Sequence, residues 1–167
     1  MSLKTALSAE LQKLVGFSAP VPRPVLATAP GNIDLAIDLI AVDTMSCSFR
    51  EIRLRVPSLA AAEVGVLGEW AERFCKRITY LLENIGPIEV DPQQDRVLVR
   101  STPPDKQDDE TLFYEILLQS HANGNFSLRR YRTTKSDAGR AQVDMQTTQE
   151  VLLKLVDDLV DTIPATA

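Results

Sequence analysis

The dipeptide Asn123-Gly124 lies between two apolar-rich segments, residues 111–121 and 125–132. A two-residue hairpin loop of type I′ needs a positive φ at both positions, and Asn and Gly adopt that conformation at low cost. The pair therefore predicts a β-hairpin, and with it an antiparallel sheet in the second half of the chain. No catalytic or cofactor-binding motif of comparable strength occurs in the sequence, so its strongest local signal concerns architecture rather than chemistry.

Apolar residues with helical spacing predict three amphipathic helices. The first covers residues 1–16, and the second is a helical region over residues 57–84 that Gly86-Pro87 ends. Thr147 and Glu150 form a capping-box pattern at the start of the third. The apolar face of this third helix comprises Val151, Leu152, Leu155, Val156, Leu159, Val160 and Ile163, and its polar face comprises Asp157, Asp158 and Asp161.

Strand patterns occupy much of the remaining chain. Alternating apolar residues predict a strand over residues 33–43, and a change of phase in the next strand predicts a β-bulge near Arg50-Glu51. Residues 88–90 and 96–100 flank a polar loop and predict a second hairpin. A short strand-like segment covers residues 142–145.

The predicted fold class is α+β, with the element order α-β-β-α-β-β-β-β-(β)-α. Short connections between strands indicate an antiparallel β-sheet, and three one-sided helices must pack on one face of it to form a two-layer sandwich. We expect a single domain made of an N-terminal helix (residues 1–16), a proline-rich arm (17–32) and a sheet-and-helix core (33–164). The arm carries Pro20, Pro22, Pro24 and Pro30, which favour an extended segment without regular structure.

The composition is that of an acidic globular chain. Its 167 residues carry a net charge of −5, which argues against general binding to nucleic acid or to anionic membranes. No apolar run reaches the roughly 20 residues that a membrane-spanning helix needs. Cys47 and Cys75 are expected as small buried side chains in a reducing compartment, and a disulfide bond between them has no support in the sequence. We therefore expect a cytoplasmic protein.

Polar residues of opposite parity to the apolar ones should gather on the sheet face that the helices leave open. That face is expected to carry Asp34, Asp38, Glu51, Arg53, Arg55, Arg96, Arg100, Glu115, Gln119, Arg129 and Tyr131. Mixed charges on neighbouring strands are typical of a solvated face with cross-strand ion pairs. Alternatively, the guanidinium groups bind carboxylates or phosphates of a partner.

Under the second interpretation the candidate binding residues are Arg53, Arg55, Arg96, Arg100, Arg129 and Tyr131. Trp70 and Tyr80, which flank the apolar stripe of the central helix, are candidate interface anchors. A local basic cluster of Arg129, Arg130, Arg132, Lys135 and Arg140 lacks the aromatic platforms of a nucleic-acid site. It fits better as a basic rim that balances the acidic last helix.

Patterns for catalysis or metal binding are weak. His121 adjoins the predicted hairpin turn, a poor position for a catalytic imidazole that needs an orienting partner. Asp34 and Asp38 share a strand face, but four residues along a strand separate them by about 13 Å, too far for one metal ion. One histidine and two separated cysteines fall short of a zinc site. We therefore expect no catalytic residue, no metal and no cofactor.

The sequence predicts a non-enzymatic domain that binds another protein, with a homodimer as the expected assembly. In size, acidic charge and element order the chain resembles the small acidic secretion chaperones, although it has more strands after the central helix and a proline arm after the first. That resemblance implies a chaperone-like role.

The alternative function is that of a small-molecule-binding domain with a cavity between the sheet and the last helix. The cavity would be lined by Leu112, Tyr114, Ile116, Leu118, Phe126, Leu128, Leu152, Val156 and Val160. An enzyme that acts through dispersed polar residues is a further alternative.

Overall fold

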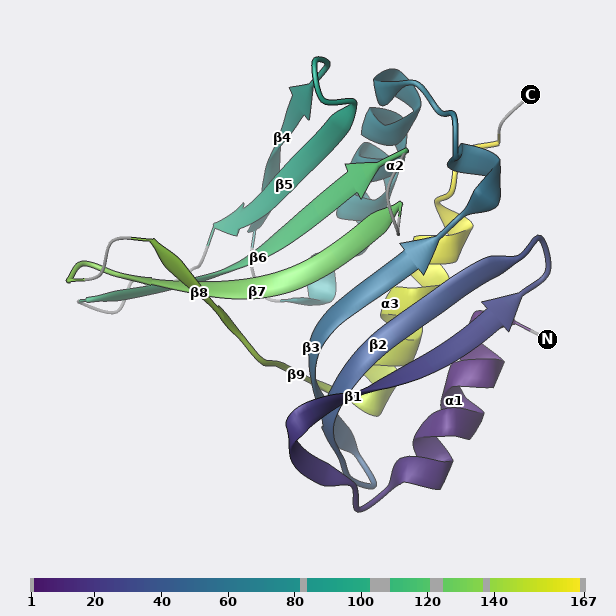
Figure 1. Cartoon of the computed structure of the whole chain (residues 1–167), viewed down its shortest axis with the longest axis vertical. Helices are drawn as coiled ribbons and strands as arrows, with labels where there is room; N and C mark the ends of the chain where they lie inside the picture. The colour runs from purple at the N-terminus through teal and green to yellow at the C-terminus, as the bar shows by residue number, and fades with distance from the viewer. Residues whose placement is uncertain (1, 82–83, 103–108, 121–124, 137–138, 166–167) are drawn as a thin grey trace.

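The computed structural model describes residues 2–81, 84–102, 109–120, 125–136 and 139–165 (Figure 1). Within these residues the chain forms three α-helices, two short 3-10 helices and nine strands. In chain order the elements are α1 (Leu3–Leu14), β1 (Ser18–Ala29), β2 (Ile33–Val42), β3 (Ser46–Arg55), η1 (Pro57–Leu59), α2 (Val64–Arg77), η2 (Thr79–Leu81), β4 (Asn84–Asp91), β5 (Arg96–Thr102), β6 (Glu110–Gln119), β7 (Phe126–Thr134), β8 (Arg140–Val143), β9 (Met145–Thr148) and α3 (Gln149–Asp161).

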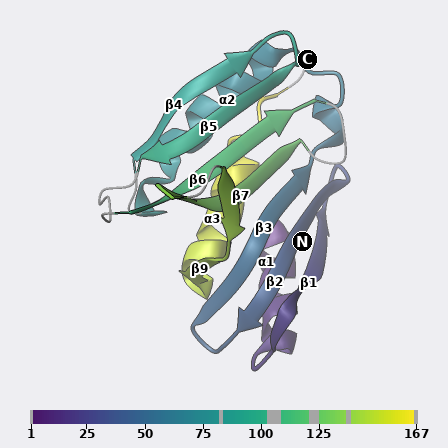
Figure 2. The same cartoon turned by 60° about the vertical axis from the view of Figure 1, so that its left-hand side comes forward.

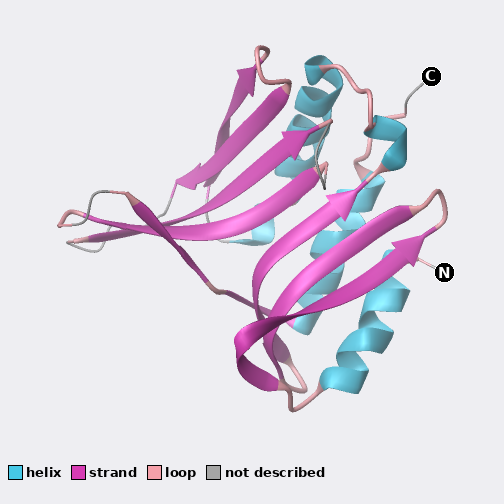
Figure 3. Ribbon diagram, viewed as in Figure 1, coloured by secondary structure: helices cyan, strands magenta, loops and turns pink. Residues whose placement is uncertain are grey.

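The nine strands of the described residues form one antiparallel sheet in the order β1-β2-β3-β7-β6-β5-β4. β8 pairs with β7 and β9 pairs with β3, so both lie off this path. The helices α1, α2 and α3 lie on the same side of the sheet (Figure 2, Figure 3). The predicted α+β class, an antiparallel sheet with helices on one face, is confirmed. The face turned away from the helices is called the outer face below.

The core lies between the helices and the sheet. Trp70 and Phe74 of α2 pack on Phe126 of β7, with ring centroids 5.9 and 5.4 Å apart. The Trp70 indole N–H donates a hydrogen bond to the Leu159 carbonyl of α3 at 3.3 Å, which links the two helices. Burial of each such aromatic side chain stabilises the fold by about 1.5–3 kcal/mol before the entropic cost is subtracted. No helix of the described residues has the length and apolar character needed to cross a membrane.

The prediction of an irregular proline-rich arm is wrong, because Ser18–Ala29 forms β1, an edge strand that pairs with β2. Val25 and Ala27 are buried in the core. An edge strand tolerates prolines where the missing N–H would face solvent. Pro20, Pro22 and Pro24 occupy alternate positions, and they remove donors from an edge that could otherwise pair with another sheet.

The predicted bulge in β3 is confirmed, because the register with β2 shifts opposite Arg50-Glu51. The shift places Phe49 and Ile52, which are three residues apart, on the same buried face. A second shift, in β2, is not predicted from the sequence. It buries Val42, whereas strict alternation predicts an inward Ala41.

The central helical region differs from its prediction. α2 ends at Arg77, and the predicted stop signal Gly86-Pro87 lies within β4. Gly86 has a φ of 136° and lies in a register shift of the β4–β5 pair, between Ile85 and Ile88. The two residues therefore mark an irregularity in a strand rather than the end of a helix. The predicted hairpin of β4 and β5 is confirmed.

The two strands predicted to flank Asn123-Gly124 are confirmed. β6 and β7 are antiparallel neighbours, paired from Glu110 with Thr134 to Leu118 with Phe126. Asn123-Gly124 itself lies outside the described residues. The single strand predicted over residues 142–145 is instead two short strands, β8 and β9, separated by Asp144.

The last helix begins one residue later than the capping-box pattern predicts. Its N-cap is Thr148, whose Oγ1 accepts a hydrogen bond from the Val151 N–H at 3.1 Å. Thr147 is held in strand β9, where it pairs with Cys47. Strand pairing thus determines where the helix can start.

Asp158, predicted for the polar face of α3, is 7% exposed. Its carboxylate accepts a hydrogen bond from the Tyr80 hydroxyl at 2.7 Å, and nitrogen atoms of Arg77 and Lys154 each lie 3.6 Å from it. Arg77 also pairs with Asp161. Burial and the hydrogen bond to Asp158 raise the pKa of Tyr80 well above its usual value. The cluster joins α3 to the segment that follows α2.

We predict that Tyr80→Phe lowers the free energy of unfolding by about 1 kcal/mol near neutral pH, because it removes one hydrogen bond to a charged group. The raised pKa keeps the folded phenol neutral, whereas a tyrosine of the unfolded chain ionises above about pH 10. The stability from this group is therefore present below that pH and is lost as the pH rises above it. Urea unfolding of the unmodified chain and of Tyr80→Phe, near neutral pH and at about pH 11, should show that their difference in free energy of unfolding is smaller at the higher pH. A difference that does not change with pH would contradict the role given to the Tyr80 hydrogen bond.

A second polar junction connects the end of β3 to the β6–β7 hairpin. Asn125 is 5% exposed, and its Oδ1 accepts a hydrogen bond from the Val56 N–H at 2.7 Å. Its Nδ2 donates to the Gln119 carbonyl at 3.1 Å, and its own N–H donates to the Leu54 carbonyl at 2.9 Å. The side chain thereby satisfies the buried N–H that follows β3 and a half-buried carbonyl of β6.

Asn125→Ala should lower the free energy of unfolding by about 2–3 kcal/mol, because the Val56 N–H is left buried without an acceptor. Ser127→Ala, two residues further along on the half-buried outer side of β7, is the matched control and should change stability by less than about 0.5 kcal/mol. Chemical denaturation measures both. Equal losses for the two variants would show that the Asn125 hydrogen bonds are not what holds this junction.

Candidate functional site

Four charged residues form a row across the outer face. The register pairs Glu51 of β3 with Arg129 of β7, Arg129 with Glu115 of β6, and Glu115 with Arg100 of β5. Charges of opposite sign therefore alternate over four neighbouring strands, an arrangement that stabilises cross-strand pairs. We call these four residues the charge ladder.

Each glutamate of the charge ladder holds two arginines. Glu51 receives Arg53 Nη1 at 2.9 Å and lies 3.0 Å from Arg129 Nη2. Glu115 receives Arg100 Nε at 3.2 Å and is also paired with Arg140 Nη1. Both glutamate side chains are 10% exposed, whereas the four arginine side chains are 35–50% exposed. The two carboxylates thus lie deeper in the face than the arginine side chains that hold them.

Neighbouring groups extend this arrangement. Arg53 donates to both oxygens of Asp38 at 2.9 and 3.1 Å, and these bonds raise the pKa of Arg53. A hydrogen bond to the Tyr131 hydroxyl, with a contribution from Glu51, raises the pKa of Arg129. The two guanidinium groups are therefore held as fixed cations.

All five arginines predicted as binding residues lie on the outer face. Arg53, Arg100 and Arg129 belong to the ion-pair network just described. Arg55 pairs with Asp34, and Arg96 Nε lies 3.9 Å from Asp91. The cross-strand ion pairs of the first sequence interpretation are thus present.

Of the aromatic candidates, Tyr131 lies on the outer face as predicted, whereas Trp70 does not lie at the edge of the core. Trp70 is completely buried and Tyr131 is 7% exposed, so neither ring is open to a partner. Tyr80 is half-buried, with its hydroxyl bound to Asp158. Trp70 was expected at the edge of the helix stripe, but α3 packs over it and supplies the Leu159 carbonyl. As an interface anchor, Trp70 is a wrong prediction.

Arg140, predicted only as a member of the basic cluster, also lies on the outer face. The β7–β8 pairing brings it there, and its guanidinium lies over the Tyr131 ring at 3.9 Å. Arg130, adjacent to Arg129, has the opposite parity and lies over Tyr114 on the other face. The basic cluster is thus divided between two faces. Strand alternation predicts that division, but the position of Arg140 depends on tertiary pairing.

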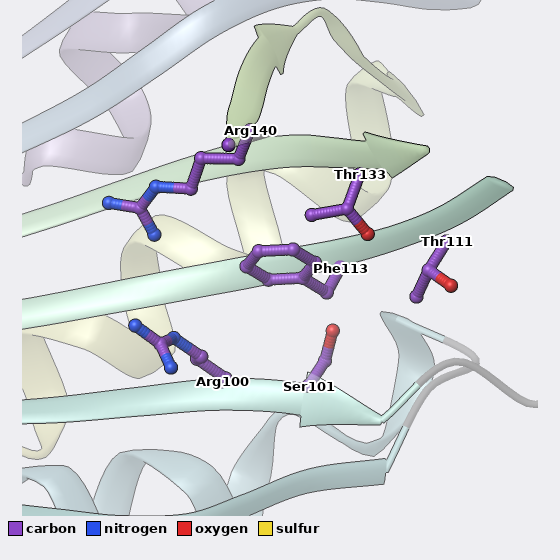
Figure 4. Close-up of a pocket in the computed structure, with 7 residues that line it drawn as sticks. Arg100, Ser101, Thr111, Phe113, Thr133 and Arg140 are labelled. Atoms are coloured by element: carbon purple, nitrogen blue, oxygen red, sulfur yellow. The ribbon is translucent and has the colours of Figure 1, made fainter. Parts of the chain in front are cut away.

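A surface pocket of about 590 Å³ adjoins the Arg100 end of the charge ladder (Figure 4). Its lining residues are Arg100, Ser101, Thr111, Phe113, Thr133, Gly139 and Arg140. In Figure 4 the Arg100 and Arg140 guanidinium groups lie on one side of the Phe113 ring, and Thr111, Thr133 and Ser101 lie on the other. The pocket therefore has a cationic end and an end with small hydroxyl side chains, with an aromatic ring between them.

Most of the residues expected to line a cavity between the sheet and α3 belong to the core. Ile116, Leu118, Phe126, Leu128, Leu152 and Val156 are all buried in one continuous cluster. The pocket at the end of the charge ladder is lined by none of the residues expected there.

Reactive groups are few within the described residues. These contain no group of three or more His, Cys, Asp or Glu side chains placed to hold a metal ion, and His121 lies outside them. Cys47 and Cys75 are unpaired thiols. Burial raises the pKa of both, that of Cys75 to about 11, so both stay protonated and weakly nucleophilic at neutral pH.

No protein-family model, no curated protein and no solved structure matches this chain.

Glu51→Gln should lower the free energy of unfolding by about 1–2 kcal/mol. Arg129 loses the carboxylate that it contacts, whereas Arg53 retains that of Asp38. Glu69→Gln on α2 is the matched control, since Glu69 pairs with Arg73 at 2.6 Å with both side chains about half exposed. That change should stay within about 0.5 kcal/mol. Chemical denaturation compares the two variants, and equal effects would show that the charge ladder is not a structural element.

Proposed function

We propose that the chain is a non-enzymatic protein-binding domain whose outer face contacts an acidic segment of a partner protein. The observation that supports this most directly is that the two carboxylates of the charge ladder are more deeply buried than the arginine side chains that they pair with. Glu51 and Glu115 lie beneath, at 10% side-chain exposure, and hold four arginines that are 35–50% exposed. The face therefore presents cations although the chain as a whole carries a charge of −5.

Guanidinium groups held in this way suit the recognition of carboxylates. An arginine fixed by a carboxylate on one side retains N–H donors on the other, and its planar fork can form two parallel hydrogen bonds. Because the side chain is already ordered, less conformational entropy is lost when a partner binds. Electrostatic repulsion from the rest of this acidic chain orients an acidic partner towards the outer face.

The acidic charge of the chain favours a protein partner over nucleic acid. A chaperone-like role, which the resemblance to secretion chaperones implies, is one form of this function. The cytoplasmic location expected from the two cysteines belongs to the same proposal. A homodimer is the proposed assembly, and native mass spectrometry of the isolated chain tests it.

The direct test uses a fluorescent oligo-glutamate peptide as the probe and measures fluorescence anisotropy. Arg53→Gln combined with Arg55→Gln removes two outer-face cations while Glu51 keeps Arg129. This double variant should bind the probe at least about tenfold more weakly, a loss of about 1.4 kcal/mol. Added salt should weaken binding of the unmodified chain.

Arg73→Gln combined with Lys76→Gln on α2 is the matched control, because it changes the net charge by the same amount on the helix side. The control should retain the affinity of the unmodified chain. Equal losses in both double variants, or no binding of the probe at all, would overturn the proposal. Tighter binding of single-stranded DNA than of oligo-glutamate would also overturn it, in favour of a nucleic-acid partner.

A further inference from the structure

The pocket at the end of the charge ladder combines parts from four strands. β5 contributes Arg100, β6 contributes Phe113, β7 contributes Thr133, and β8 contributes Arg140 (Figure 4). Its volume of about 590 Å³ falls in the range of small-molecule sites, roughly 300–1,000 Å³. The site is separate from the Arg53 and Arg55 end of the outer face, so the inference below does not depend on the proposed protein partner.

The cationic end of the pocket has an excess of positive charge. Arg100 and Arg140 share a single carboxylate, that of Glu115. Arg100 uses its Nε and Arg140 uses one Nη for that contact, and within the described residues no further hydrogen-bond partner of either guanidinium is found. Two cations with one carboxylate leave a charge of about +1, which one anionic group would neutralise.

The aromatic floor of the pocket is held in place by its neighbours. Phe113 packs against Tyr131 with ring centroids 5.8 Å apart, and Arg140 lies over the same Tyr131 ring at 3.9 Å. One buried tyrosine thus positions both the floor and one of the two cations. Such prior ordering reduces the conformational entropy that a ligand would otherwise have to offset.

The geometry points to a site for a small organic anion in which a carboxylate or phosphate group is joined to a planar apolar ring. The anionic group binds the N–H groups of Arg100 and Arg140 that Glu115 does not use, and the ring lies over Phe113 towards Thr111 and Thr133. Inorganic phosphate uses only the cationic end, and a neutral aromatic molecule uses only the floor. Each of these should therefore bind more weakly than a molecule that carries both groups.

The experiment titrates the protein with phenyl phosphate and follows backbone amide signals by NMR, with inorganic phosphate and benzyl alcohol as single-group controls. Phenyl phosphate should shift signals of the residues around Phe113 and Arg140. It should bind at least about tenfold more tightly than either control. Equal binding of inorganic phosphate would overturn the proposed ligand class, and shifts confined to other parts of the chain would overturn the site.

Arg140→Gln should weaken the binding of phenyl phosphate by about tenfold, since one of two charge-assisted contacts is lost. Arg96→Gln is the matched control, because Arg96 lies on β5 and on the same face as Arg100 but outside the pocket. Its affinity should be unchanged. Equal losses in the two variants would overturn the assignment of the cationic end.

Two further variants and a competing peptide test the same site. If the amide spectrum shows that Arg140→Gln is not folded, Arg100→Gln replaces it, with the same tenfold loss expected. Phe113→Leu should reduce the affinity for phenyl phosphate to that for inorganic phosphate. Oligo-glutamate that displaces phenyl phosphate and loses affinity in Arg140→Gln would assign the pocket to a protein partner and overturn the small-molecule ligand.

Discussion

The helices cover only one face of the sheet, and the charge arrangement of the opposite face is a consequence of that constraint. α1, α2 and α3 all lie on the apolar side, where Trp70 and Phe126 join helix to strand. The outer face has no such cover in the described chain, so its central polar groups have to satisfy one another. A carboxylate that is nearly buried on a sheet is tolerated when it is paired and hydrogen-bonded. Glu51 and Glu115 meet that condition because each faces two arginines.

The same pairing has a structural consequence and a consequence for the proposed binding of a partner. For the sheet, alternating charges on β3, β7, β6 and β5 favour one strand register, because a slip by one residue would turn every charged side chain to the apolar face. In the proposed binding of a partner, the glutamates would fix the direction of the guanidinium groups without covering them. An arginine on an unstructured surface would have to be ordered by its partner, whereas Arg53 and Arg129 are ordered already.

Local patterns predicted the parts of this site that depend on local geometry. Alternation along single strands placed Arg53, Arg100 and Arg129 on one face, because the period of a strand is a property of the strand alone. The bulge at Arg50-Glu51 was predicted for the same reason. Tertiary placement was not accessible in this way. Trp70 is buried by a helix whose contacting residue, Leu159, is 89 positions away, and Arg140 reaches the pocket only because β8 pairs with β7. The prediction for β1 was wrong because the effect of proline depends on the position of the strand. Proline disrupts a strand in the middle of a sheet but is tolerated in a strand at its edge.

β7 changes its neighbour halfway along its length. Residues Phe126 to Arg129 pair with β3, whereas Arg130 to Thr133 pair with β8, a strand of four residues. A short strand at such a branch opens at a lower free energy than the long central strands. Its amide hydrogens should therefore exchange with solvent earlier than those of β3 and β6. The outer face consequently consists of two regions of unequal rigidity: the charge ladder lies in the centre of the sheet, while the pocket loses its Arg140 wall each time β8 opens.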